Sequence, residues 1–383
     1  MSELSPRVAA ELADAVYNVR NEFDLKFFLA RLEFSSKAEA KQHLKAEVGS
    51  RLFNTRDGFG ICAMGGKGYE NELFLIFRGT TTANNNADWI SNARIGVKFS
   101  KNGLPVHVGF DHIFTSMLPK IKDFLSANKN ITMVHCVGHS LGGAVATLAA
   151  DWIKSNRATM VKLYTFGAPK PGLLLFSTNL TRKLGKKNIF RTYHATDPVP
   201  MVPLFPFLHP PLPGYGHYIP SNENILSADA HDMVRYIDSV KTASWPSLER
   251  RSPPYTVESG VQQWLMSKAP VSASSPKIWH WINAGLTYVL SKVLGGALGA
   301  LQLGFTGVLT LADTIALILR RGIDLSKAAG EWVMLLMRKI MQALGMKVAK
   351  TSEELTKELL ESTLRRLMAR TTEEAKKAIM RIH

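Results

Sequence analysis

The spacing of apolar residues changes along the chain, and each change marks a predicted element. Residues 5–47 repeat apolar side chains at helical spacing, which predicts helices. Two apolar runs at residues 59–64 and 73–77 then flank the glycine-rich stretch 65–68. This pattern predicts a β-hairpin.

Strand-like and helical patterns alternate in the middle of the chain. The apolar run 132–137 meets Gly138-His139-Ser140-Leu141-Gly142, and the alanine-rich run 143–150 follows. Later strand-like runs cover 161–167 and 188–194. Strands that alternate with helices predict an α/β fold with a mainly parallel sheet, whose active groups lie at the carboxyl ends of the strands.

The motif around Ser140 carries the first candidate chemistry. A G-x-S-x-G motif between a strand and a helix is typical of a nucleophile elbow, whereas the bare motif also occurs in ordinary glycine-rich loops. Its glycines remove Cβ atoms where strand and helix approach each other. We therefore expect Ser140 at the N-terminus of the helix as a nucleophile, with the N–H of Leu141 as one oxyanion donor.

An activated serine needs a base and an orienting carboxylate, in the chain order Ser, Asp, His for this arrangement. Asp197 follows a predicted strand directly, although an Asp at this place could also cap a turn. His209, His217 and His231 are the candidate bases, and their spacing does not choose among them.

Composition narrows the class of protein. The chain has 383 residues, 46% of them hydrophobic, and a formal net charge of +16, so it can bury a large core and favours anionic partners. No nucleic-acid module is visible, so a membrane surface is the expected partner. Cys62 and Cys136 are expected as buried free thiols, and no metal or cofactor motif is found. The first 19 residues lack the apolar run of a signal peptide, which predicts an export route independent of such a peptide, if the protein is exported.

The last third of the chain is expected to be helical. Residues 246–276 contain Pro- and Ser-rich breaks and are predicted as a linker. Residues 293–312 lack charge and reach the length of a membrane span, although a buried helical hairpin fits the same pattern. Capping signals at Thr351 and Thr371 predict the starts of two terminal helices.

The chain resembles the class 3 lipases of fungi and plants over roughly residues 8–240. The resemblance rests on motifs that occur in order: Phe77-Arg78-Gly79-Thr80, Asp88-Trp89-Ile90-Ser91-Asn92, Val106-His107-Val108-Gly109-Phe110, Gly138-His139-Ser140-Leu141-Gly142-Gly143, Tyr164-Thr165-Phe166-Gly167-Ala168-Pro169, Asp197-Pro198-Val199-Pro200, Gly214-Tyr215-Gly216-His217 and His231-Asp232-Met233-Val234-Arg235-Tyr236.

This resemblance implies an α/β-hydrolase fold for residues 1–245. The later residues have no counterpart in the family's catalytic domain, and their own pattern predicts the linker and a helical, membrane-associating or bundled region at 277–383. The resemblance implies that Thr80 contributes to the oxyanion hole and that the next residues, including Thr81, Trp89 and Ile90, form a lid. It also implies His231 as the catalytic base and a structural role for His217.

The expected activity is serine-dependent hydrolysis of carboxylic esters in membrane lipids, most simply a phospholipase A reaction on bacterial glycerophospholipids. The layout is similar to that of lipase effectors of type VI secretion, which implies a secretion-apparatus partner and an immunity protein. Two alternatives stay open from the sequence: a triacylglycerol or small-ester lipase with a structural helical tail, and a pore-forming toxin on a lipase-like scaffold.

Overall fold

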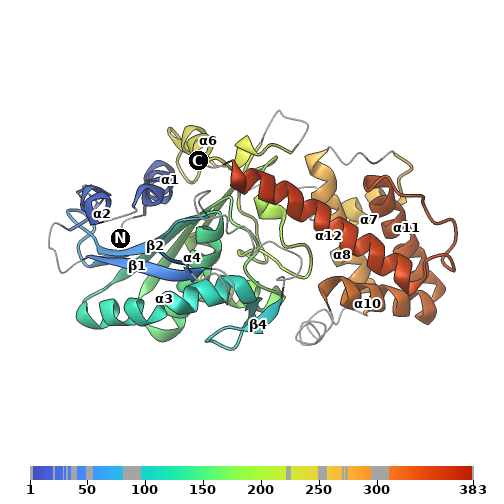
Figure 1. The fold of residues 1–383 in the computed structure, drawn as a ribbon, viewed down its shortest axis with the longest axis horizontal. Helices are drawn as coiled ribbons and strands as arrows, with labels where there is room; N and C mark the ends of the chain where they lie inside the picture. The colour runs from blue at the N-terminus through green and yellow to red at the C-terminus, as the bar shows by residue number, and fades with distance from the viewer. Residues whose placement is uncertain are drawn as a thin grey trace.

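The structure is a computed structural model of the whole chain, and it places an α/β half beside a helical C-terminal half (Figure 1). The residues that it describes are 3–19, 22–28, 30–31, 33–35, 41–48, 55–80, 96–220, 226–248, 257–269, 271, 275–294 and 310–381.

A seven-stranded sheet forms the centre of the α/β half, in the order β1-β2-β3-β6-β7-β8-β9. Its strands are β1 (Lys41–Val48), β2 (Thr55–Met64), β3 (Glu72–Phe77), β6 (Met133–His139), β7 (Met160–Phe166), β8 (Ile189–His194) and β9 (His217–Ile219). The β1–β2 and β2–β3 pairs are antiparallel, and the four later pairs are parallel. The sheet is therefore mainly parallel, as predicted.

Strand β3 shows why both faces of this sheet are covered. Its alternate residues Leu73, Leu75 and Phe77 join one hydrophobic core, whereas Phe74 and Ile76 join another. The first core contains α3 (Val108–Ala127), α4 (Leu141–Asn156) and α5 (Leu174–Leu184), and the second contains α1 (Pro6–Ala15) and α6 (Met233–Val240). Cys62 and Cys136 are free and buried, as expected.

The N-terminal prediction was only partly right. The helices α1, η1 (Val16–Asn18) and α2 (Glu22–Phe28) lie in the expected range, and the hairpin β2–β3 forms where predicted. Strand β1, however, occupies the end of the range predicted as helical, because its residues pair with β2 along the edge of the sheet. A separate two-stranded ribbon pairs β4 (Val97–Phe99) with β5 (Pro105–His107).

The helical half has its own core. It consists of α7 (Glu258–Met266), α8 (Pro276–Val293), α10 (Leu311–Leu325), α11 (Lys327–Ala343) and α12 (Lys357–Met380). Helix α7 lies inside the range predicted as a linker, and it buries Val261 and Leu265 against the neighbouring helices.

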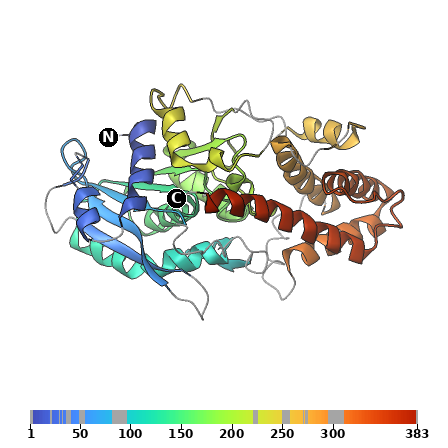
Figure 2. The ribbon, with the colours of Figure 1, turned by 45° about the horizontal axis from the view of Figure 1, so that its top comes forward.

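Helix α12 joins the two halves. It is the long red helix that runs from the helical half back to the α/β half, where the C-terminus lies (Figure 2). Its first residues bury Leu360 and Leu364 in the helical core, whereas its last turns bury Ala378 and Ile379 in the core of the α/β half. At the same end of the helix, Arg381 forms an ion pair of 2.8 Å with Asp229.

The predicted starts of the terminal helices were wrong. The helix begins at Lys357, where the side chain of Thr356 accepts a hydrogen bond from the N–H of Leu359, and not after Thr351. Thr371 lies inside α12, and its hydroxyl donates to the carbonyl of Leu367. One continuous helix replaces the two that were expected.

Most of the predicted membrane span, residues 293–312, lies outside the residues that the structure describes. Among the helices that are described, none combines the length and the apolar composition needed to cross a bilayer.

Candidate active site

Ser140 occupies a strained turn between β6 and α4. Its backbone has φ 53° and ψ −132°, a left-handed conformation that non-glycine residues adopt rarely. A Cβ at Gly138 would collide with the backbone of Gly142, and one at Gly142 would collide with the carbonyl of Phe77. The motif therefore needs its glycines, and the turn places Ser140 at the N-terminus of α4.

The structure brings Ser140, His231 and Asp197 together as a chain of hydrogen bonds. His231 Nε2 lies 2.9 Å from Ser140 Oγ, and His231 Nδ1 lies 2.8 Å from Asp197 Oδ2. The three residues are at most 1% exposed. Because Nδ1 can donate to the carboxylate, Nε2 is left to accept the proton of the hydroxyl, which is the arrangement of a serine nucleophile and its base.

The carboxylate of Asp197 has two further donors. The hydroxyl of Tyr236 donates to Oδ2 at 2.7 Å, and the N–H of Val199 donates to Oδ1 at 2.9 Å. Burial, followed by the nearby charge of Asp197, holds the pKa of Tyr236 well above its usual range, so this hydroxyl stays a donor. These bonds fix the direction of the carboxylate toward His231.

His139 fixes the backbone of the base. Its Nε2 lies 2.9 Å from the carbonyl oxygen of His231, and its Nδ1 lies 2.8 Å from the hydroxyl of Tyr17. With Nε2 as the donor, Nδ1 accepts from Tyr17, whose pKa is raised by burial. The turn η1, which contains Tyr17, therefore supports the site through His139.

The next predicted residues are those of the oxyanion hole and those of the lid. Leu141 begins α4 directly after Ser140, and Thr80 follows Gly79, where a Cβ would stand 2.9 Å from Ser140 Cβ. The positions of the predicted lid, including Thr81, Trp89 and Ile90, lie outside the described residues.

The other two candidate bases lie elsewhere. His217 Nδ1 is 3.1 Å from the carbonyl oxygen of Leu248, and His209 Nε2 is 2.8 Å from that of Pro200. Both of these bonds are to backbone carbonyls, whereas the bonds to Ser140 and Asp197 come from His231.

Sequence reasoning missed the supporting residues. Tyr236 stood in the motif around His231, and His139 stood in the elbow motif, but neither received a role. Tyr17 and His194 had no signal, because they reach the site only through the fold. His194 stacks on Tyr236 with ring centroids 4.1 Å apart, and its N–H donates to the Tyr236 hydroxyl.

The mainly parallel sheet, the strained serine turn and the Ser-His-Asp chain define the α/β-hydrolase class. Residues 74–207 match the model of the family described as Lipase (class 3). This part of the chain is similar to that family, as the motifs had indicated.

Three known relatives illustrate the range of the similarity. A secreted mono- and diacylglycerol lipase 1 from Fusarium solani is 36% identical over 154 residues, which are 39% of this chain and 43% of the relative. A chloroplastic phospholipase A(1), DAD1, from Arabidopsis thaliana is 31% identical over 34% of each chain. The toxin TseL from Vibrio cholerae is 35% identical over 26% of this chain and 15% of the relative. The chain thus spans half or less of the length of each of these relatives.

Proposed function

We propose that this protein is a serine-dependent carboxylic ester hydrolase that acts on membrane glycerophospholipids as a phospholipase A. The observation that carries the proposal is the buried Ser140–His231–Asp197 chain at the end of the parallel strands. His231 takes the proton of Ser140 as the hydroxyl attacks the ester carbonyl, and Asp197 stabilises the imidazolium that forms.

The oxyanion of the tetrahedral intermediate is assigned to the N–H of Leu141 and to Thr80. Removing one such donor costs roughly 3–4 kcal/mol of transition-state stabilisation in comparable sites. The imidazolium then protonates the leaving alcohol, and water releases the fatty acid in the second half of the reaction.

A phospholipid substrate is supported by two observations. The net charge of +16 favours anionic membrane surfaces, and one relative is named a phospholipase A(1). The fungal relative is named a mono- and diacylglycerol lipase, which supports hydrolysis of neutral glycerides as a second candidate function.

The test compares fatty-acid release from three substrates: phosphatidylglycerol vesicles, phosphatidylcholine vesicles and a diacylglycerol emulsion. We expect the fastest release from the anionic vesicles, and none with Ser140→Ala. Ser116→Ala, the same change at a serine of α3 that is not part of the triad, is the matched control and keeps the activity. Faster release from diacylglycerol would favour the second candidate, and release that survives Ser140→Ala would refute the triad.

We further propose that the protein is an antibacterial effector with a cognate immunity protein, in support of which one relative is named a toxin. Directed expression in a bacterial host tests this proposal. We expect growth arrest when the protein is sent to the periplasm, but not when Ser140→Ala is sent there. Toxicity that survives Ser140→Ala would favour a pore-forming protein instead.

A further inference from the structure

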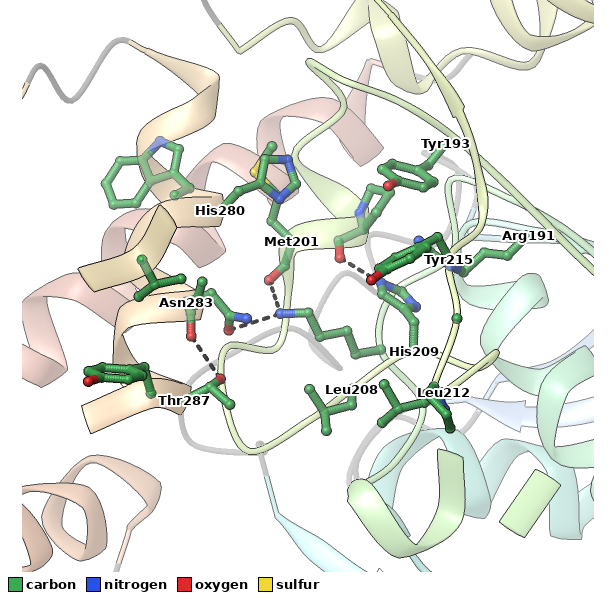
Figure 3. A pocket seen from close by; sticks show the side chains of 18 of the residues that line it. Arg191, Tyr193, Met201, Leu208, His209, Leu212, Tyr215, His280, Asn283 and Thr287 are labelled. Atoms are coloured by element: carbon green, nitrogen blue, oxygen red, sulfur yellow. Dashed lines mark hydrogen bonds between the residues drawn. The ribbon is translucent and has the colours of Figure 1, made fainter. Parts of the chain in front are cut away.

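A cavity of about 430 Å³ lies between the α/β half and the helical half, and none of the triad residues lines it. Helix α8 forms one wall with His280, Asn283 and Thr287, while Arg191 and Tyr193 lie on the opposite wall (Figure 3). Its volume is within the usual range of small-molecule pockets. We call it the Lys170 cavity, after the buried lysine that lines it.

The Lys170 ammonium is incompletely bonded. Its Nζ donates to the carbonyl of Met201 at 2.8 Å and to Asn283 Oδ1 at 3.2 Å, whereas an ammonium group has three donors. The side chain is 6% exposed, and no carboxylate among the described residues pairs with it. Burying a charge without an opposite charge is costly, so this lysine has the environment of a ligand-binding cation.

Lys339, in the helical half, is a buried lysine whose ammonium group has protein acceptors for its hydrogen bonds. Its Nζ lies 2.8 Å from the carbonyl oxygen of Ser267, 2.9 Å from the hydroxyl of the same residue and 3.4 Å from the carbonyl oxygen of Ala269. All three of its donors therefore have protein acceptors, and it does not line the Lys170 cavity.

Arg191 supplies a second cation to the cavity. Its guanidinium carbon lies 4.2 Å from the ring centroid of Tyr193, and its Nε is buried without an acceptor in the described part of the structure. Glu258 is the carboxylate among the lining residues, and it pairs with Lys292 at 3.1 Å. Two basic side chains therefore line the cavity, and each keeps a donor without an acceptor among the described residues.

The two lining histidines add no charge near neutral pH. Burial lowers the pKa of His280 to about 3, and it holds that of His209 well below the usual range. The same effect, with the repulsion of Arg191, lowers the pKa of Lys170 to about 7. A bound anion would offset that cost and return the lysine to its charged form.

Apolar side chains complete the lining, among them Val261, Leu208, Leu212, Trp279 and Ala284. We propose that the Lys170 cavity binds an oxyanion head group carried on an apolar chain, with Lys170 and Arg191 holding the oxyanion and the apolar residues holding the chain. Two sources share this chemistry, the carboxylate of a fatty acid and the phosphate of a lipid head group. The inference does not depend on the proposed hydrolysis.

Calorimetric titration of the 383-residue Ser140→Ala protein tests the proposal without turnover. The ligands are octanoate, octyl phosphate, inorganic phosphate and neutral octyl glucoside, all below their micellar concentrations. We expect micromolar to millimolar binding of at least one of the two chain-bearing anions, and at least tenfold weaker binding of octyl glucoside. Tighter binding of octanoate identifies the fatty acid as the source, and tighter binding of octyl phosphate identifies the phosphate head group.

Two variants assign the binding to the cavity. Lys170→Met and Arg191→Gln are each expected to weaken it at least tenfold, whereas Lys268→Met, an exposed lysine with the same change of net charge, leaves it unchanged. Because there are two cavity variants, the binding test can still be made if one of them fails to fold. Equal binding of octyl glucoside, inorganic phosphate binding as tightly as the chain-bearing anions, unchanged affinity in both cavity variants, or no binding of any ligand by the folded protein would overturn the proposal.

Discussion

The protein holds two buried polar clusters, the triad and the Lys170 cavity, and they differ in how completely their hydrogen-bonding groups have protein partners. Around the triad, Asp197 accepts hydrogen bonds from Tyr236, Val199 and His231. In the Lys170 cavity, two cations keep unused donors and lack a carboxylate partner in the described structure. A complete network fixes groups for chemistry, whereas an incomplete one in a cavity indicates a place for a ligand.

The two clusters also differ in origin. The triad and its supporting residues all come from the α/β half, whereas the cavity needs α8 from the helical half. They meet at the turn η7 (Val199–Met201): Val199 donates to Asp197 at its start, and the carbonyl of Met201 accepts from Lys170 at its end. Because the two clusters use different side chains, substitutions in the triad should change hydrolysis, whereas substitutions in the Lys170 cavity should change ligand binding.

The largest expected effect comes from the base of the triad. His231→Ala should lower kcat/KM for a soluble ester by about 10⁴-fold or more, because the serine loses the group that accepts its proton. His217→Gln is the matched comparison, and it should keep the activity of the folded protein within a few fold, because His217 is bonded to Leu248. The reverse result would show that the base has been assigned to the wrong histidine.

The two histidines also show how much of the site could be predicted from the sequence alone. The elbow was predictable because Gly138, Ser140 and Gly142 solve a local steric problem that few other residues can solve. The choice of His231 over His217 was not, since both follow the last predicted strands and only the packed fold decides which ring faces Asp197. The resemblance to the lipase family supplied that choice.

A smaller effect is expected from a positioning residue of the triad. Tyr236→Phe removes the 2.7 Å hydrogen bond to Asp197 Oδ2, and bonds to a charged group contribute about 1.5–3 kcal/mol. We expect kcat to fall by roughly 10–100-fold with little change in KM, because the substrate contacts remain. Steady-state kinetics on a soluble ester measures this split. A large rise in KM at constant kcat would show that Tyr236 does not act through the triad.

Helix α12 provides a test of how the halves are joined. Ile379 is 2% exposed and belongs to the core of the α/β half, so Ile379→Ala should lower the free energy of unfolding by about 2 kcal/mol. Met380, its neighbour, is 58% exposed, and Met380→Ala should change stability by less than about 0.5 kcal/mol. Denaturant unfolding of both variants checks the contact, and equal stabilities would contradict it.

The same helix explains why the tail was harder to predict than the sheet. The apolar stripe that includes Leu360 and Leu364 was predicted correctly, because helical periodicity is a local property. The starts at Thr351 and Thr371 were wrong, since a capping signal is short and also occurs in turns and inside helices. Strand β1 was missed for a related reason, because pairing with β2 determines its conformation.

The smallest expected effect concerns the pH dependence of stability. The pKa of Lys170 falls from 10.5 to about 7 in the folded protein, so above pH 7 the unfolded chain binds a proton that the native state does not. The free energy of unfolding should therefore rise by about 1.4 kcal/mol per pH unit from this group. The lining histidines titrate below this range, and the buried thiols, whose pKa values are raised by burial, act only above pH 9.

Denaturant unfolding between pH 7 and 8.5 isolates this contribution as the difference between the native protein and Lys170→Met. That difference should change with pH at the predicted slope, in favour of the native lysine as pH rises. A constant offset from the lost hydrogen bonds to Met201 and Asn283 does not affect the slope. Lys268→Met, the exposed control, should follow the native protein at every pH. If the difference between the native protein and Lys170→Met does not change with pH, burial does not lower the pKa of Lys170, and the contrast between the two clusters fails.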